Sequence, residues 1–129
     1  MPEPIPFEQW PEDKRSRELI VQQWFGRDLM AHARDFAVKR IPSTATPEAR
    51  ELAKKAAFDA LYGVMQILDG VTGDSLDEQR AVEFLLLGRV VQSNEGGRDE
   101  VLEEYEIGPG GEGLCHSFPR WTKDDFGDS

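Results

Sequence analysis

The only cysteine of the chain, Cys115, stands directly before one of its two histidines, His116. A cysteine becomes a catalytic nucleophile when a base lies within about 3 Å and a third group orients that base. The stretch from Leu114 to Phe118 has a strand-like composition, and neighbouring side chains on a strand point to opposite faces. The pair would then not meet, although His32 from an earlier helix could serve the thiol. We expect Cys115 to be a small buried residue, and we predict no catalytic residue.

Metal and phosphate sites need residue spacings that this sequence lacks. Its two histidines and one cysteine form no HxxxH, HExxH or CxxC pattern. The acidic loop DGVTGDSLDEQ lacks the ligand pattern of a calcium loop. The glycine-rich GPGGEG at 108–113 lacks the Lys-Ser/Thr pair of a phosphate loop. We therefore expect neither a metal nor a cofactor.

A polar strip along the second predicted helix is the most enzyme-like feature. At 3.6 residues per turn its side chains share an arc of roughly 80°. They are Lys55, Asp59, Tyr62, Gln66 and Asp69. With a histidine nearby, Asp59, Tyr62 and Asp69 would suit a small hydrolase or ligand-binding enzyme. Glu48 and Glu51 continue the same arc, however, and we favour the alternative that the strip is the water-facing side of the helix.

The charge of the chain is concentrated in its C-terminal half. Residues 1–58 hold ten Lys/Arg and nine Asp/Glu, whereas residues 59–129 hold five and sixteen, so the net charge of −10 arises entirely from the second half. Such a field repels nucleic acid and anionic membranes. A basic protein is the partner that this charge favours. The alternative is that the charge serves solubility alone, as it often does in bacterial cytosolic proteins.

The segment 95–112 carries seven acids against a single Arg98, with Leu102 and Tyr105 between them. Acids around an aromatic anchor indicate a protein-docking edge. The alternative is a solvated hairpin whose charge prevents edge pairing. The predicted protein-binding residues are Glu100, Leu102, Glu103, Glu104, Tyr105 and Glu106.

The first helix should run to about Arg40, before the break at Ile41-Pro42. Its main apolar face includes Phe25 and Phe36, with His32 at the centre as a core residue. A second, narrower stripe predicts a homodimer with Trp24 near its axis. The residues of this predicted dimer interface are Ile20, Trp24, Ala31 and Val38.

The second helix begins at Thr46 as N-cap and Pro47, and it ends at Gly70. Its apolar residues recur at spacings of three and four throughout. We expect this helix to be the most buried element. The residues predicted to be nearly inaccessible are Phe58, Leu61, Val64, Met65 and Leu68.

The sequence of the second half of the chain predicts β structure. Strands are predicted at 81–92 and 99–107, and a third at 114–118. The predicted fold is α+β, with two long antiparallel helices packed against a small antiparallel sheet of two or three strands. We expect one domain of 129 residues. Its parts are an extended proline-rich arm (1–11), a helical half (12–70), a β half (80–122) and a frayed acidic tail (123–129).

The second predicted helix contains Ala60-Leu61-Tyr62-Gly63-Val64 and then Ile67-Leu68-Asp69-Gly70, and a strand hairpin follows it. This arrangement resembles a family of small bacterial α+β proteins. Some of those proteins are suspected immunity partners of secreted toxins. The resemblance spans residues 50–107 and implies a protein partner, without catalytic residues. From the composition of residues 1–10 and the short apolar runs we expect neither a secretory signal nor a membrane helix, and the single cysteine fits a reducing compartment. We expect a cytoplasmic, non-enzymatic protein-binding module with an immunity or regulatory role.

Overall fold

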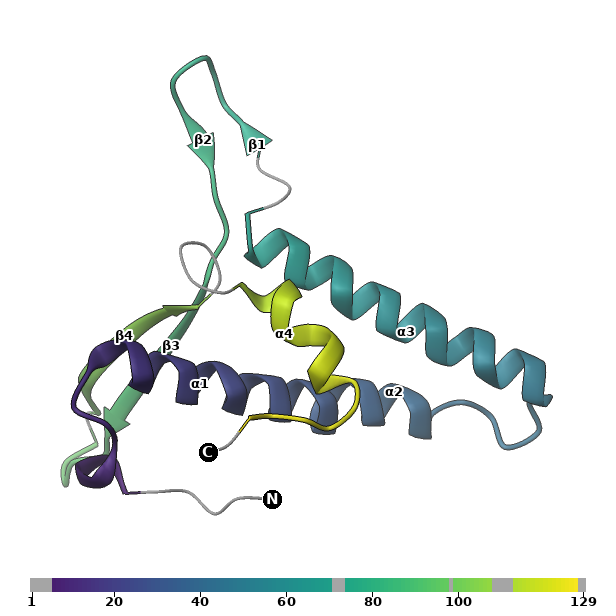
Figure 1. Ribbon diagram of the computed structural model, residues 1–129, viewed down its shortest axis with the longest axis horizontal. Coiled ribbons are helices and arrows are strands. Elements are labelled where there is room, and N and C mark those ends of the chain that lie inside the picture. The colour runs from purple at the N-terminus through teal and green to yellow at the C-terminus, as the bar shows by residue number, and fades with distance from the viewer. Residues whose placement is uncertain (1–5, 71–73, 98, 108–112, 128–129) are drawn as a thin grey trace.

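Helices make up most of the computed structural model, which describes residues 6–70, 74–97, 99–107 and 113–127. After a short 3-10 turn, η1 (Phe7–Gln9), three segments form one continuous helical rod: α1 (Lys14–Leu29), the π-helical η2 (Met30–Arg34) and α2 (Asp35–Lys39). α3 (Pro47–Leu68) returns antiparallel to this rod, and the short α4 (Leu114–Trp121) lies between them and contacts both (Figure 1).

The helix boundaries follow from capping residues. The Asp13 carboxylate accepts a hydrogen bond from the Ser16 N–H (2.9 Å), so α1 begins after Asp13. The Thr46 hydroxyl likewise accepts from the Ala49 N–H (3.1 Å), and α3 ends before Gly70, whose φ is 78°. The predicted start and end of the second helix are confirmed.

The strands form two separate antiparallel hairpins. β1 (Asp74–Ser75) and β2 (Ala81–Val82) make a small hairpin that projects from the body of the molecule (Figure 1). β3 (Leu86–Gln92) and β4 (Glu100–Ile107) make the larger one, which packs on α1. The α+β class is confirmed, but the predicted strand 81–92 is broken at 83–85, and the strands within the described residues form two sheets rather than one. The predicted third strand at 114–118 is wrong, because this stretch is helical.

α4 is the most completely buried element. Its inward residues recur at the helical spacing of three and four, and they are Leu114, Ser117, Phe118 and Trp121. The Trp121 ring lies directly on the backbone of Gly26 and edge-on to Phe25 at 6.1 Å. Its indole N–H donates to Gln23 Oε1 at 2.9 Å. This helix therefore joins the rod to α3, whereas the predicted fold had both long helices packed against the sheet.

The prediction that the second helix is the most buried element is wrong. Of its five residues predicted to be inaccessible, only Met65 is buried; Phe58, Leu61 and Leu68 are half-buried, and Val64 is 46% exposed. The physical reason is that the larger sheet packs on α1, while α4 covers only one side of α3. The other side of α3 is left to solvent.

A π-helical segment changes which side chains of the rod face inward. In a π turn the backbone hydrogen bond spans five residues, so the following side chains are rotated relative to a continuous α-helix. Met30 is buried at the start of this segment, whereas His32 is exposed and Phe36 is 58% exposed. The prediction of His32 as a core residue is therefore wrong.

Candidate functional site on the acidic hairpin

A bulge in β4 determines which residues of the larger hairpin face outward. Val90 pairs with Glu103 but Val91 pairs with Val101, so Leu102 has no partner on β3. Beyond the bulge the strand alternates, and its inward residues are Glu103, Tyr105 and Ile107. Strict alternation would place Val101 on the same side as Glu103. The bulge instead leaves Val101 exposed beside Val91.

Two of the predicted protein-binding residues, Glu103 and Tyr105, attach the hairpin to α1. The Arg17 guanidinium donates to both carboxylate oxygens of Glu103, at 3.0 and 2.8 Å, and these hydrogen bonds lower the pKa of Glu103. Tyr105 lies beside this pair and is only 1% exposed; burial raises its pKa. Both side chains are held within the fold, so we assign them a structural role rather than contact with a partner.

The exposed residues of β3 and β4 form a surface that we call the hairpin face. Four large hydrophobic side chains on it are 41–44% exposed: Leu87, Val91, Val101 and Leu102. The charged residues on it are Arg89, Glu104 and Glu106, whereas the exposed Glu100 lies at its edge, paired with Gln92 at the start of β4. Arg89 lies opposite Glu104 in the strand register. Leu102, Glu104 and Glu106 of the predicted binding residues therefore share this face, and Glu100 is exposed at its edge. The apolar residues of β3 were not predicted as part of the site.

A groove of about 500 Å³ runs between β3 and α1, next to the hairpin face. Its apolar wall includes Trp24, Phe25 and Leu29, and its polar side chains include His32 and Arg89. Within the described residues β3 pairs only with β4, so its other edge is not covered by a strand. The groove thus extends the exposed surface around the edge of the hairpin.

The predicted dimer stripe on the first helix does not form a continuous open surface. Trp24 packs edge-on against Trp10 at 5.7 Å, and the Arg27 guanidinium lies 5.4 Å from the centre of its ring. Of the other three residues predicted for this interface, Ile20 and Val38 are half-buried and Ala31 is exposed. The segment around Trp10 occupies the position that we predicted for a second subunit.

The polar strip on α3 does not converge on one site. Both Asp69 carboxylate oxygens accept N–H bonds at 2.7 Å, from Leu114 and Cys115, and so cap the N-terminus of α4. Tyr62 packs against Phe118, with ring centres 5.5 Å apart. Asp59 instead pairs with Lys55 in solvent at 2.6 Å. Each of the three residues proposed for the enzyme alternative has a separate structural partner.

The environment of Cys115 opposes formation of a thiolate. Burial, together with the nearby Asp69 carboxylate, raises the pKa of the thiol to about 11. His116 is the next residue on the helix and is exposed. The thiolate is the nucleophilic form, so this thiol is poorly suited to catalysis near neutral pH. Among the described residues, no group of three or more His, Cys, Asp and Glu is placed to hold a metal ion.

We expect Cys115 to react with a thiol reagent near pH 7 more slowly in the native protein than in denaturant. Its folded pKa of about 11 lies above the value of about 8.5 for an unfolded thiol. The unfolded chain therefore loses the thiol proton at a lower pH than the folded chain. The contribution of the thiol to the free energy of unfolding is lost as the pH rises from about 8.5 to about 11. Cys115→Ser should remove that part of the pH dependence. Faster reaction in the native state would contradict the assignment.

Comparison of the chain with known protein families, with curated proteins and with solved structures finds no match. None of the helices in the described part of the chain is both long enough and apolar enough to cross a membrane.

Proposed function

We propose that the chain is a non-enzymatic, cytoplasmic protein-binding module that recognises a basic partner through the hairpin face. The observation that carries this proposal is the exposure of Leu87, Val91, Val101 and Leu102, at 41–44%, on the same face as the exposed acids Glu104 and Glu106. Protein interfaces combine an apolar centre with a polar rim, and their apolar residues are covered on binding. The hairpin face has both components.

The sign of the charge selects the class of partner. Glu104 and Glu106 outnumber Arg89 on this face, and Glu100 adds a third acid at its edge. Residues 59–129 hold sixteen acids against five basic residues. Acidic surfaces attract basic proteins over a distance of about one Debye length and so raise the association rate. The same field opposes binding to nucleic acid and to anionic membranes.

The most specific form of this proposal is an immunity or regulatory role. The resemblance of residues 50–107 to small bacterial α+β proteins of that kind supports it. A rigid hairpin suits this role, because the Arg17–Glu103 pair and the buried Tyr105 hold β4 on α1 before a partner arrives. A preorganised surface loses less conformational entropy when it binds.

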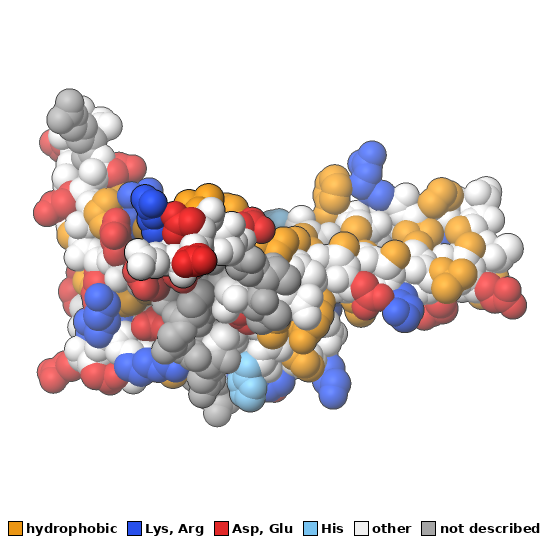
Figure 2. Space-filling view, turned by 90° about the horizontal axis from the view of Figure 1, so that it is seen from above, with side chains coloured by type: hydrophobic (Ala, Val, Ile, Leu, Met, Phe, Trp, Pro, Cys, Tyr) orange, Lys and Arg blue, Asp and Glu red, His pale blue; other side chains and the backbone are white. Residues whose placement is uncertain are grey.

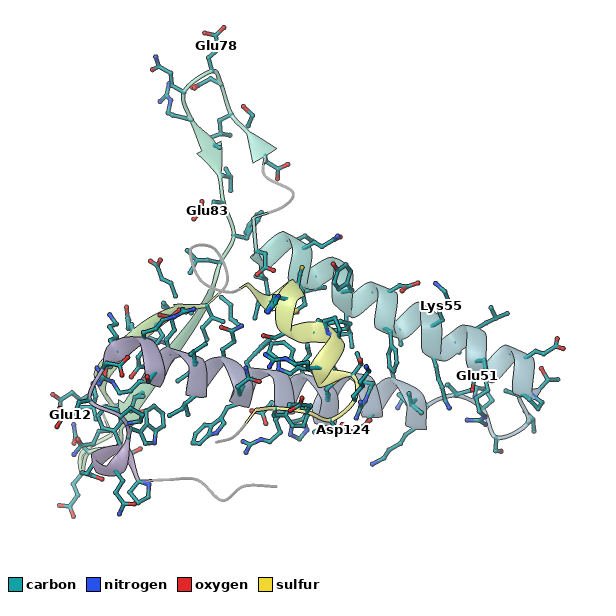
Figure 3. The ribbon with its side chains drawn as sticks, in the orientation of Figure 1. Glu12, Glu51, Lys55, Glu78, Glu83 and Asp124 are labelled. Carbon is teal, nitrogen blue, oxygen red and sulfur yellow. The ribbon has the colours of Figure 1, made fainter. Side chains whose placement is uncertain are left out.

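Capture from a lysate of the native host tests the proposal with two triple variants of equal charge change. One replaces Glu100, Glu104 and Glu106 with Lys, and the control replaces Glu12, Glu78 and Glu83 with Lys. Figure 3 shows Glu12 near η1, Glu78 at the tip of the projecting hairpin and Glu83 at the base of that hairpin. We expect the wild type and the control to capture the same basic protein and the hairpin variant to lose it. Equal capture by both variants would refute a role for the hairpin face.

A further inference from the structure

α3 has a second apolar face, directed away from the core. Its large side chains are Leu52 at 69%, Val64 at 46% and Ile67 at 42% exposed. Figure 2 shows hydrophobic side chains along the arm of the molecule that contains α3. Helix geometry places eight residues within an arc of about 120°. This set, which we call the α3 outer face, is Ala49, Leu52, Ala53, Ala56, Ala60, Gly63, Val64 and Ile67.

The residues in the middle of this face, Ala56 and Ala60, are exposed. A Cβ atom added to Gly63 would meet no other atom within 4 Å. A contiguous exposed apolar surface marks an interaction site. The charges on α3 are also balanced, with Arg50, Lys54 and Lys55 against Glu48, Glu51 and Asp59. Two copies of this helix can therefore approach each other without the repulsion expected between two acidic halves.

We propose that the α3 outer face is the contact surface of a homodimer, in which α3 of a second copy packs antiparallel against it. A twofold axis near residue 58 places Ala56 level with Ala60 of the second copy and Leu52 level with its Val64. The small side chains then meet at the centre, where they allow the two helices to approach closely. The large side chains meet near both ends, so the face is complementary to itself.

The charged edge of α3 fits the same arrangement. Lys55 and Asp59 lie on one side of the outer face, and within one chain they pair at 2.6 Å while remaining 72% and 66% exposed. Figure 3 shows Lys55 directed away from the other elements. The twofold axis brings Lys55 of each copy beside Asp59 of the other, on the same edge of the interface. Opposite charges thus line both halves of this edge.

The oligomeric state in solution tests the dimer directly. We expect sedimentation velocity to show a concentration-dependent dimer for the full chain. Ala56→Glu should weaken it by roughly a hundredfold, because it buries an unpaired charge at the axis. Ala31→Glu adds the same charge at an exposed position outside the face and should leave the dimer intact. A wild-type monomer at high micromolar concentration, or equal loss in both variants, would overturn the proposal.

A charge-exchange experiment separates contacts between copies from the pair within one helix. Lys55→Glu and Asp59→Lys should each weaken self-association roughly tenfold, since each places like charges across the twofold axis. Mixing the two variants creates two opposite-charge pairs between copies, although each chain keeps its own repulsive pair. We expect the mixture to form a heterodimer of near wild-type affinity. Failure of the mixture to associate better than either variant would exclude this geometry.

The α3 outer face and the hairpin face lie on different elements, so either proposal can fail without affecting the other.

Discussion

Gly26→Ala is expected to destabilise the protein by about 1–3 kcal/mol or more, although alanine is the better helix former. A Cβ atom at this position would lie 2.2 to 2.6 Å from three atoms of the Trp121 ring. That ring is fully buried, packs edge-on against Phe25 and donates a hydrogen bond to Gln23. Neither the ring nor the α1 backbone can move without opening the core.

Gly63→Ala is the matched control, because it adds the same methyl group to a helical glycine with open space around it. It should stabilise the monomer by up to about 1 kcal/mol. Urea unfolding of both variants, at protein concentrations where the chain is monomeric, measures the two effects. If both substitutions stabilised the protein, α4 would not be packed against Gly26.

Met65→Ala is expected to cost about 2–5 kcal/mol, whereas Val64→Ala should cost less than about 1 kcal/mol. Met65 is fully buried, but the adjacent Val64 is 46% exposed. Leu61→Ala should fall between them, because Leu61 is half-buried against the core. The comparison identifies which side of α3 supports the fold.

Thermal or urea unfolding measures how much each of these three alanine substitutions in α3 lowers the free energy of unfolding. Large and equal costs for Met65→Ala and Val64→Ala would show that both sides of α3 are covered in the monomer. That result would contradict the exposed α3 outer face.

Local signals predicted several elements correctly. Thr46, Pro47 and Gly70 mark α3 because capping chemistry depends on residues close in sequence. Glu104 and Glu106, predicted as part of a docking edge from the acidic composition of residues 95–112, are both exposed. The bulge at Leu102 depends on how β4 pairs with β3, so no pattern in the local sequence predicts it.

Short helices and the choice between two apolar faces were harder to predict. The spacing of Leu114, Phe118 and Trp121 fits a helix, but a short apolar run fits a strand as well, and Pro119 weakens the helical signal. α3 carries apolar residues on two sides, and its sequence alone does not say which side the rest of the chain covers. Here that choice depends on α4, which was predicted as a strand.

The candidate site was only partly accessible to sequence reasoning. Tyr105 was predicted to be an exposed aromatic anchor because acids surround it in the sequence. It is only 1% exposed, because the Arg17–Glu103 ion pair holds β4 against α1. That ion pair joins residues 86 positions apart and has no signature in the local sequence. The exposed anchors of the hairpin face are instead aliphatic, and two of them, Leu87 and Val91, come from β3.

The association rate of the captured partner at low and high salt tests the central proposal most directly. Raising the ionic strength from about 0.05 to about 0.5 M shortens the Debye length from about 14 to about 4 Å. We expect the wild type and the Glu12/Glu78/Glu83 control to associate markedly more slowly at high salt. The Glu100/Glu104/Glu106→Lys variant should be slow at both. A partner that binds this variant as fast as the wild type, at both salt concentrations, would contradict binding through the hairpin face.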